Sequence, residues 1–390
     1  MAAISLKPLW IGCLLFILLS SGPAAARTSL VALPLRQDTA VKLSSRGFTL
    51  VQEKRTLTFK KGVNNIDFSW QNVMIDPDSI LFAPLGQTDG IRVLSVSYPP
   101  GESALIWDVY SPDDRQEEVM ISYLLAHIDG ITTYHAVADP DESFIHLKSY
   151  MVLRNFSGET FDRAAVSINN SVPHTTSVDH LETKRILVGE QSDIPIRKIY
   201  TWDALKMPHD PQRARAAVGI PVVYEILNSA ESRLGKTALL EGKARIFQDD
   251  GNQGSIFLGE DTCPFTPVGD KARLHIGDSR DVVVTRKVMD SKRSRIRRDK
   301  KGNIQVYDET VAVHIIAENL KDRPMTLSVV ETIDGHWESL DIPMTYRQLD
   351  HKTLQFDIRL APGETKTLPL RYKILNIFSG SFSRYNRVSR

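Results

Sequence analysis

Alternation of apolar and polar residues is the commonest pattern in this chain. Apolar side chains occupy every second position in 57–59 and 66–70, and again in 354–360 and 368–374. Successive side chains of a β-strand point to opposite faces, so a period of two indicates strands with one buried face. The turn dipeptide Pro362-Gly363 separates the last two segments. The pattern therefore predicts two hairpins, one near each end of the chain.

Long helical periodicity is missing from the chain, whereas turn dipeptides recur between the alternating segments. The chain contains Asp89-Gly90, Asp129-Gly130, Asp250-Gly251 and Asp334-Gly335. Parallel sheets need long crossover connections, which are usually helices. We therefore predict an all-β fold of tandem antiparallel β-sandwich units with an immunoglobulin-like C-terminal sandwich.

Breaks in the alternation suggest a division into consecutive segments. We expect an N-terminal strand-rich unit over 27–100 and a central β-sandwich over 101–302. An immunoglobulin-like sandwich is expected over 303–375, followed by a flexible tail over 376–390 that is rich in Ser and Arg.

The first 26 residues have the pattern of a signal peptide. Lys7 is their only charge, an apolar run covers 10–19, and Ala24-Ala25-Ala26 provides the small residues of a cleavage site. Cleavage near Ala26 would place the mature protein in the periplasm or outside the cell. No later stretch reaches the roughly 18 apolar residues of a membrane helix, so we expect no transmembrane span in the mature chain.

Charge and cysteine content narrow the function classes. The chain has 48 basic and 47 acidic side chains, and the lysine in the leader accounts for the difference. A neutral exported chain has no overall field that would attract nucleic acid, so a nucleic-acid partner is excluded. After the leader Cys263 is the only cysteine, so no internal disulfide can form. A small buried hydrophobe is the favoured interpretation of this thiol, with a catalytic thiol as the alternative.

The clearest compositional signal is the basic segment 286–301. It holds nine basic and two acidic residues, a local charge of +7. One interpretation is a solvated hairpin or linker that pairs with acidic groups elsewhere in the chain. The other is a contact for an envelope protein, an anionic polysaccharide or anionic lipid. The residues expected to make that contact are Arg293, Arg295, Arg297 and Arg298.

No motif for a metal, a cofactor or a catalytic centre stands out. The acidic stretch 249–255 lacks the ligand order of a calcium loop, and its Asp, Gly and Asn residues favour a hairpin turn. A glycosidase needs only two converging carboxylates from anywhere in the chain, so a hydrolase stays an alternative. The candidate carboxylates are Glu260, Asp261, Glu331 and Glu338, with Trp202 and Trp337 as candidate aromatic neighbours.

Several blocks resemble one bacterial exported family. They are Gly47 to Leu57, Leu153 to Phe161, Gly242 to Phe247 and Asp308 to Tyr372. This chain resembles the domain of unknown function 4139 family, whose named relative is mucoidy inhibitor A. The resemblance implies a β-rich exported fold and no specific chemistry, because the family has no established activity.

Two positions depart from the family pattern. Phe265 stands where members often carry a histidine, and the segment Gly130 to Tyr134 lacks a tryptophan found in relatives. Neither position therefore carries a family-wide catalytic role here. The sequence predicts an exported, envelope-associated β-sandwich protein that binds or scaffolds without catalysis, and the alternative is a secreted hydrolase acting on envelope glycan.

Overall fold

The structure is a computed structural model that describes residues 29–31, 33–44, 47–86, 90–169, 171–207 and 219–379. The expected signal peptide and its cleavage site lie outside these residues, and so does most of the expected tail. The chain forms two compact units. Unit 1 contains residues up to Asp129 together with Asn155–Glu182, and unit 2 contains Gly130–Arg154 together with Thr183 onward. The passages between the units do not coincide with the boundaries expected near residues 100 and 303.

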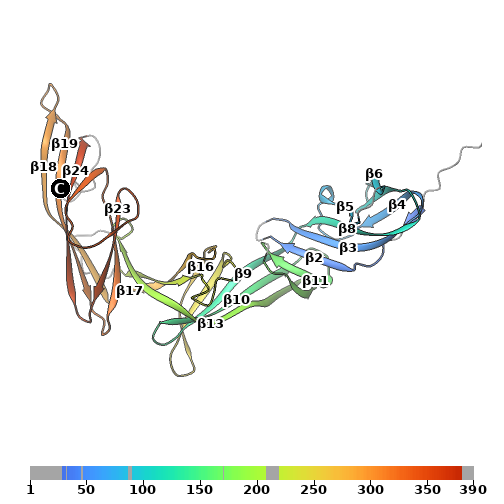
Figure 1. The fold of residues 1–390 in the computed structure, drawn as a ribbon, viewed down its shortest axis with the longest axis horizontal. Helices are drawn as coiled ribbons and strands as arrows, with labels where there is room; N and C mark the ends of the chain where they lie inside the picture. Colours follow the sequence, from blue (N-terminus) through green and yellow to red (C-terminus); the bar gives the residue numbers. More distant parts are fainter. Residues whose placement is uncertain are drawn as a thin grey trace, which may run out of the picture. The chain divides into compact units, whose positions relative to one another are not determined.

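The prediction of an all-β fold is confirmed. Within the described ranges the only helical segment is a single 3-10 turn, η1 (Pro77–Ser79). All other regular structure is β-strand, arranged in four sheets. Figure 1 shows the strands in chain order from blue to red.

Unit 1 consists of two sheets. The smaller sheet has the order β1 (Ser29–Val31), β4 (Gly62–Ser69), β7 (Ala104–Ser111), β6 (Arg92–Ser97). The larger sheet has the order β12 (His174–Val178), β11 (Phe161–Ile168), β2 (Asp38–Leu43), β3 (Thr49–Phe59), β8 (Arg115–Leu125), β5 (Leu81–Pro84).

Aromatic rings join the two sheets of unit 1. Phe68 on β4 lies 5.9 Å from the ring of Tyr123 on β8, and Trp107 on β7 lies 5.2 Å from Phe82 on β5. Trp107 and Tyr123 are almost completely buried. Contacts of this kind between facing sheets are the core of a β-sandwich.

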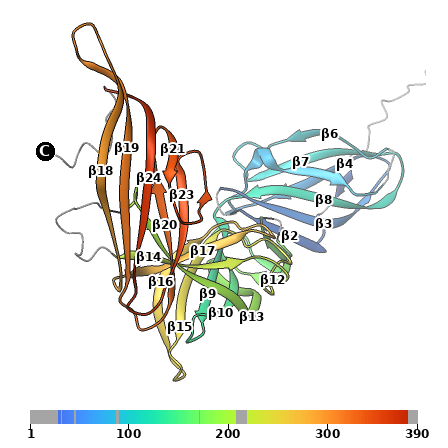
Figure 2. The ribbon, with the colours of Figure 1, turned by 60° about the vertical axis from the view of Figure 1, so that its left-hand side comes forward.

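Unit 2 contains a ten-stranded and a four-stranded sheet (Figure 2). The larger one follows the order β16 (Ser255–Cys263), β15 (Gly242–Asp249), β9 (Ile128–Ala138), β10 (Phe144–Asn155), β13 (Glu182–Asp203), β20 (Met325–Thr332), β23 (Thr353–Leu360), β22 (Arg347–Gln348). Two further strands branch from it, because β14 (Ile220–Leu227) pairs with both β13 and β17 (Lys271–Ser279). The four-stranded sheet has the order β18 (Val282–Arg298), β19 (Ile304–Asn319), β24 (Thr365–Phe378), β21 (His336–Asp341).

The alternating segments are strands with the buried face that the sequence predicts, but they are not hairpins. In β23 every second residue from Leu354 to Leu360 is buried, and the same holds in β24 from Leu368 to Ile374. However, β23 pairs with β20 and β24 pairs with β19, in different sheets. The predicted N-terminal hairpin is wrong in the same way, since β3 and β4 also lie in different sheets. Alternation specifies which face is buried, whereas it carries no information about the partner strand.

Several strand pairs are parallel, which the sequence did not predict. They include β1 with β4, β2 with β11, β9 with β15 and β13 with β20. The long connection that a parallel pair requires is supplied here by other strands rather than by a helix. Three of the four sheets therefore contain parallel pairs, whereas the sheet of β18, β19, β24 and β21 is antiparallel.

Candidate functional site

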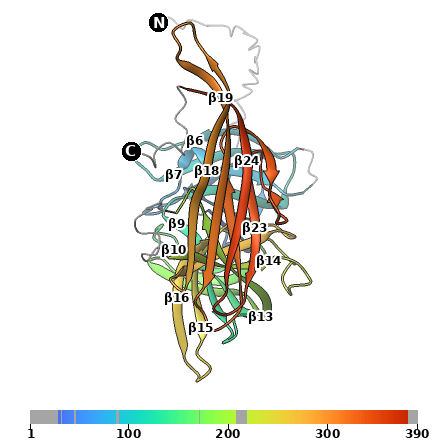
Figure 3. The ribbon, with the colours of Figure 1, turned by 90° about the vertical axis from the view of Figure 1, so that its left-hand side faces the viewer.

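The basic segment forms most of one edge strand and the turn that follows it. Strand β18 pairs with β19 from Val282 opposite Asn319 to Arg298 opposite Ile304, and it lies at the edge of the four-stranded sheet (Figure 3). Asp299 closes the tip, because its carboxylate accepts hydrogen bonds from the N–H groups of Lys301 and Asn303 at 2.8 Å. The segment is therefore the arm of a hairpin. We call β18, β19 and the turn between them the basic hairpin.

Arg286 differs from the other cations of the hairpin because it points into the fold. It lies opposite Ile315, a buried core residue, and its guanidinium donates to the carboxylate of Glu331 on β20 at 2.7–3.1 Å. The two side chains are 14% and 1% exposed. The positive charge of Arg286 is therefore paired with Glu331 inside the fold and is not available to an external partner.

The four arginines expected to bind a partner are all exposed on the basic hairpin. The Arg293 guanidinium lies 4.4 Å from the ring centroid of Tyr307, and Arg298 donates to the carbonyl of Gly302 at 2.9 Å. Arg295 lies 3.7 Å from Asp308, and Arg297 makes no such contact with the described residues. These contacts stay within the hairpin, so they orient the arginines without bringing acidic groups from elsewhere.

Asp308 is shared between several donors. Its carboxylate lies 3.1 Å from the Lys373 ammonium and accepts the Asn376 N–H at 3.0 Å, in addition to the longer contact with Arg295. Burial works to raise the pKa of Asp308, but the Asn376 N–H and Lys373 outweigh it and lower that pKa. Asp308 is therefore ionised at neutral pH. Its carboxylate lies closer to the Lys373 ammonium than to the Arg295 guanidinium, so Lys373 is its main counter-charge.

The remaining charges of the segment are predominantly basic and exposed. The eight exposed cations are Lys287, Lys292, Arg293, Arg295, Arg297, Arg298, Lys300 and Lys301. Asp290 is the one exposed acidic residue of the segment, and Asp299 is engaged by its own turn. The interpretation that acidic groups elsewhere neutralise the segment holds for Arg286, whereas the observed contacts of the four arginines are with other residues of the hairpin.

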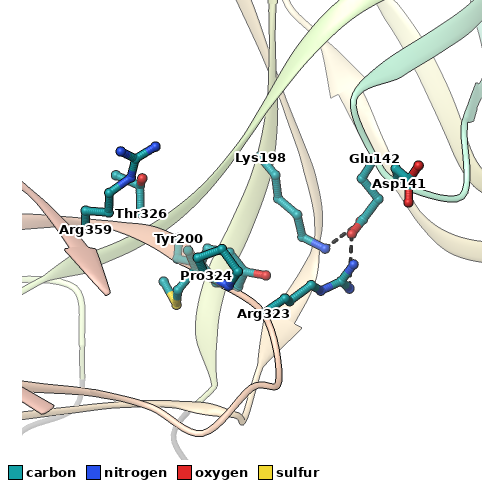
Figure 4. Close-up of a pocket in the computed structure, with 9 residues that line it drawn as sticks. Asp141, Glu142, Lys198, Tyr200, Arg323, Pro324, Thr326 and Arg359 are labelled. Atoms are coloured by element: carbon teal, nitrogen blue, oxygen red, sulfur yellow. Dashed lines mark hydrogen bonds and ion pairs between the residues drawn. The ribbon is translucent and has the colours of Figure 1, made fainter. Parts of the chain in front are cut away.

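A second charged cluster, which the sequence did not indicate, surrounds Glu142 in the turn between β9 and β10 (Figure 4). Its carboxylate accepts hydrogen bonds from Tyr224 on β14 at 2.6 Å and from Lys198 on β13 at 2.5 Å. Arg323, in the connection between β19 and β20, lies 3.4 Å away. Glu142 is 8% exposed. We call these four residues the Glu142 cluster.

The Glu142 cluster borders a pocket of about 260 Å³, whose wall also includes Tyr200, Thr326 and Arg359. Figure 4 shows Lys198 and Arg323 pointing toward the carboxylate, whereas Arg359 lies away from it. Burial works to raise the pKa of Glu142, but the hydrogen bonds from Lys198 and Tyr224 outweigh it and lower that pKa. The Glu142 carboxylate is therefore ionised and lies beside two cations, Lys198 and Arg323. Its contacts link the turn after β9 to β13, β14 and the connection after β19.

The four carboxylates considered for hydrolysis have separate surroundings. Glu260 pairs with Lys243 and Arg245, and Asp261 accepts the N–H of His275. Glu331 is buried against Arg286, as described above, and Glu338 lies exposed on β21. No observed contact joins any two of the four within the described part of the chain.

The candidate aromatic neighbours and the thiol also have structural surroundings. Trp202 is buried in the core of unit 2, and the Trp337 ring N–H donates to the carbonyl of His351 at 3.0 Å. Cys263 is 3% exposed, and burial raises the pKa of its thiol to about 12. The thiol is therefore protonated at neutral pH, as befits a small buried hydrophobe.

The acidic stretch 249–255 is a turn. It joins β15 to β16, and Asp250 accepts the N–H groups of Asn252 and Gly254 at 2.8 and 2.9 Å. The carboxylate thus holds the turn's own backbone. Among the residues that the structure describes, no group of three or more His, Cys, Asp or Glu side chains is arranged to hold a metal ion.

Comparisons with known proteins add no identification. No protein-family model matches the chain, and no significant match was found among curated proteins. In the described ranges, no helix combines the length and the apolar character needed to cross a membrane. The family resemblance of the sequence stays a prediction.

Proposed function

We propose that this protein is a non-catalytic binding protein of the bacterial cell envelope, and that it attaches to anionic envelope material through the basic hairpin. The observation that carries the proposal is the group of eight exposed cations on one edge hairpin, next to a single exposed acidic residue of the same segment. The predicted signal peptide and the resemblance to an exported bacterial family support the envelope location.

The energetics favour an external partner for these cations. Arg295 is largely exposed and lies 3.7 Å from Asp308, which Lys373 contacts more closely, so this contact stabilises the fold weakly. A Lys or Arg near an anionic surface contributes about 1 kcal/mol, and several act together on one surface. Four or more such contacts suffice for reversible attachment, and salt should weaken the attachment because the contacts are exposed.

The surroundings of the candidate carboxylates do not favour a hydrolase. The four carboxylates considered for it have separate partners, and none of the observed contacts favours catalysis by a pair of them.

The test measures binding of the purified protein to dextran sulfate and to vesicles containing phosphatidylglycerol, over a range of salt concentrations. The first variant carries Arg293→Gln, Arg295→Gln, Arg297→Gln and Arg298→Gln. We expect binding to at least one probe, weakening steeply with salt, and a loss of about two orders of magnitude or more in the variant, since each lost cation contact contributes about 1 kcal/mol. The melting temperature should change little because all four side chains are exposed.

A matched control removes four cations elsewhere, by Lys42→Gln, Arg163→Gln, Lys236→Gln and Arg280→Gln. These side chains are exposed and lie outside the hairpin. The control has the same change in net charge, so it should keep most of the binding. Equal losses in both variants, or binding that ignores salt, would contradict a specific role for the hairpin.

A further inference from the structure

Apolar side chains are exposed among the cations near the tip of the basic hairpin. Ile296 is 42% exposed and Phe378, at the end of β24, is 64% exposed. Farther along β18, Val288 and Met289 are 41% and 55% exposed. Single exposed apolar residues are common on protein surfaces, but here four accompany a cluster of eight cations.

The strand register places the apolar and cationic side chains together. Arg297 lies opposite Val306 on β19, and Val306 lies opposite Phe378 on β24. Residues directly opposite each other in antiparallel strands point to the same face, so Arg297 and Phe378 share one face of the sheet. Ile296 immediately precedes Arg297 in an irregular part of the pairing, where Arg295 has a φ of 48°. Arg297 and Phe378 therefore bring a cationic and an apolar group together on one face near the end of the hairpin, and Ile296 lies next to Arg297 in the chain.

The charge of this area argues against a second copy of the chain as the occupant. Two copies joined through the same hairpin would bring their exposed cations together, and like charges facing each other across an interface are strongly unfavourable. An acidic polysaccharide would satisfy the cations, but its hydroxyl-rich chain offers no apolar phase for Ile296 and Phe378. A bilayer interface offers both anionic phosphates and acyl chains.

Resting on the proposed function, we propose that the basic hairpin binds the surface of an anionic phospholipid bilayer. The arginines contact lipid phosphates, and the side chains of Ile296 and Phe378 enter the boundary between headgroups and acyl chains. Long Arg and Lys side chains suit this arrangement, because their charged ends can reach the phosphates while their stems lie along apolar groups. The protein attaches to the bilayer from one side and does not cross it by this hairpin.

The test uses flotation of the full protein with vesicles of phosphatidylglycerol mixed with phosphatidylcholine, and with vesicles of phosphatidylcholine alone. A variant carries Ile296→Ser and Phe378→Ser, and its control carries Leu35→Ser and Val172→Ser, two exposed apolar residues of unit 1. We expect binding to the anionic vesicles only. Removing the apolar side chains of Ile296 on the hairpin and Phe378 on β24 should weaken this binding about tenfold or more, since binding of this kind scales with buried apolar area.

Dextran sulfate separates this inference from the proposed function. The Ile296→Ser and Phe378→Ser variant should bind dextran sulfate as the parent protein does, because all cations remain. Binding to dextran sulfate without binding to anionic vesicles would overturn the bilayer proposal and leave the proposed function standing. Vesicle binding that does not change on the two apolar substitutions would also overturn the bilayer proposal. If the protein binds neither dextran sulfate nor anionic vesicles, both proposals are wrong.

Discussion

The Glu142 cluster and the basic hairpin are both rich in charge and both belong to unit 2, yet their charges are used differently. In the cluster a buried carboxylate is surrounded by donors from other segments, so its charge fixes the positions of those segments. On the hairpin, exposed arginines contact other residues of the same hairpin. The comparison shows that a cluster of charged residues indicates a binding surface only where its side chains are exposed and are not already paired with opposite charges inside the fold.

The largest expected effect lies within the basic segment itself. Arg286→Gln should lower the free energy of unfolding by about 3–5 kcal/mol, because it leaves the Glu331 carboxylate buried without its cation. The neighbouring Lys287→Gln, at an exposed position, should change it by about 0.5 kcal/mol or less. Urea denaturation measures both.

A paired replacement controls for loss of packing at this site. Arg286→Met combined with Glu331→Leu should recover most of the stability lost in Arg286→Gln, because an apolar pair does not leave a charge buried alone. If Arg286→Gln and Lys287→Gln lowered the free energy of unfolding by similar amounts, Arg286 would contribute no more to stability than an exposed cation does.

A somewhat smaller effect is expected in the Glu142 cluster. Glu142→Gln should cost about 2–4 kcal/mol, because Lys198 loses its counter-charge, while the half-exposed Arg323 can turn to water. Asp141→Asn changes the exposed neighbour and is the matched control. Guanidinium denaturation of the two variants should separate them clearly. If Glu142→Gln and Asp141→Asn have the same free energy of unfolding, the contacts of Glu142 do not stabilise the fold.

The smallest effect is the dependence of stability on acid. Glu225, a buried carboxylate on β14, accepts hydrogen bonds from Lys271 and Arg273. Burial works to raise the pKa of both Glu142 and Glu225, but their hydrogen-bond partners outweigh it and lower the folded pKa values. Their stabilisation is present above the unfolded pKa of about 4.3 and is lost as the pH falls through the folded values. The urea midpoint should therefore decline in acid below about pH 4.3.

The Glu142→Gln variant sharpens this measurement. It removes one of the two carboxylates, so the midpoints of variant and parent should approach each other in acid and differ most at neutral pH. The four-glutamine hairpin variant should follow the parent at every pH. A constant gap between Glu142→Gln and the parent would mean that its cost does not come from the lost charge.

Sequence patterns predicted burial far better than they predicted partners. The alternation in 354–360 and 368–374 identified the buried faces of β23 and β24, because side-chain period is a local property. Their pairing with β20 and β19 depends on packing between distant segments. The parallel pairs are invisible to local patterns for the same reason.

The same distinction applies to the two charged regions. The four arginines of the hairpin lie close together in sequence, between residues 293 and 298, so local composition alone was enough to find them. Glu142 receives its donors from β13, β14 and the connection after β19, which no sequence spacing indicates. Its only local sign is the turn that contains it, where an acidic residue is ordinary.

The parallel pairing of β2 with β11 has a consequence for the order of folding. Ala40 lies beside Ala165, and between them the chain contributes β9 and most of β10 to unit 2. A chain ending at Asp129 would therefore leave the inner edge of β2 open, so the first unit cannot close while only its N-terminal part has been made. Contacts of such high contact order form slowly, because the entropy of closing the intervening loop is lost before the pairing is gained. The first unit therefore keeps an unpaired β2 edge until the residues beyond the excursion into unit 2 have been synthesised.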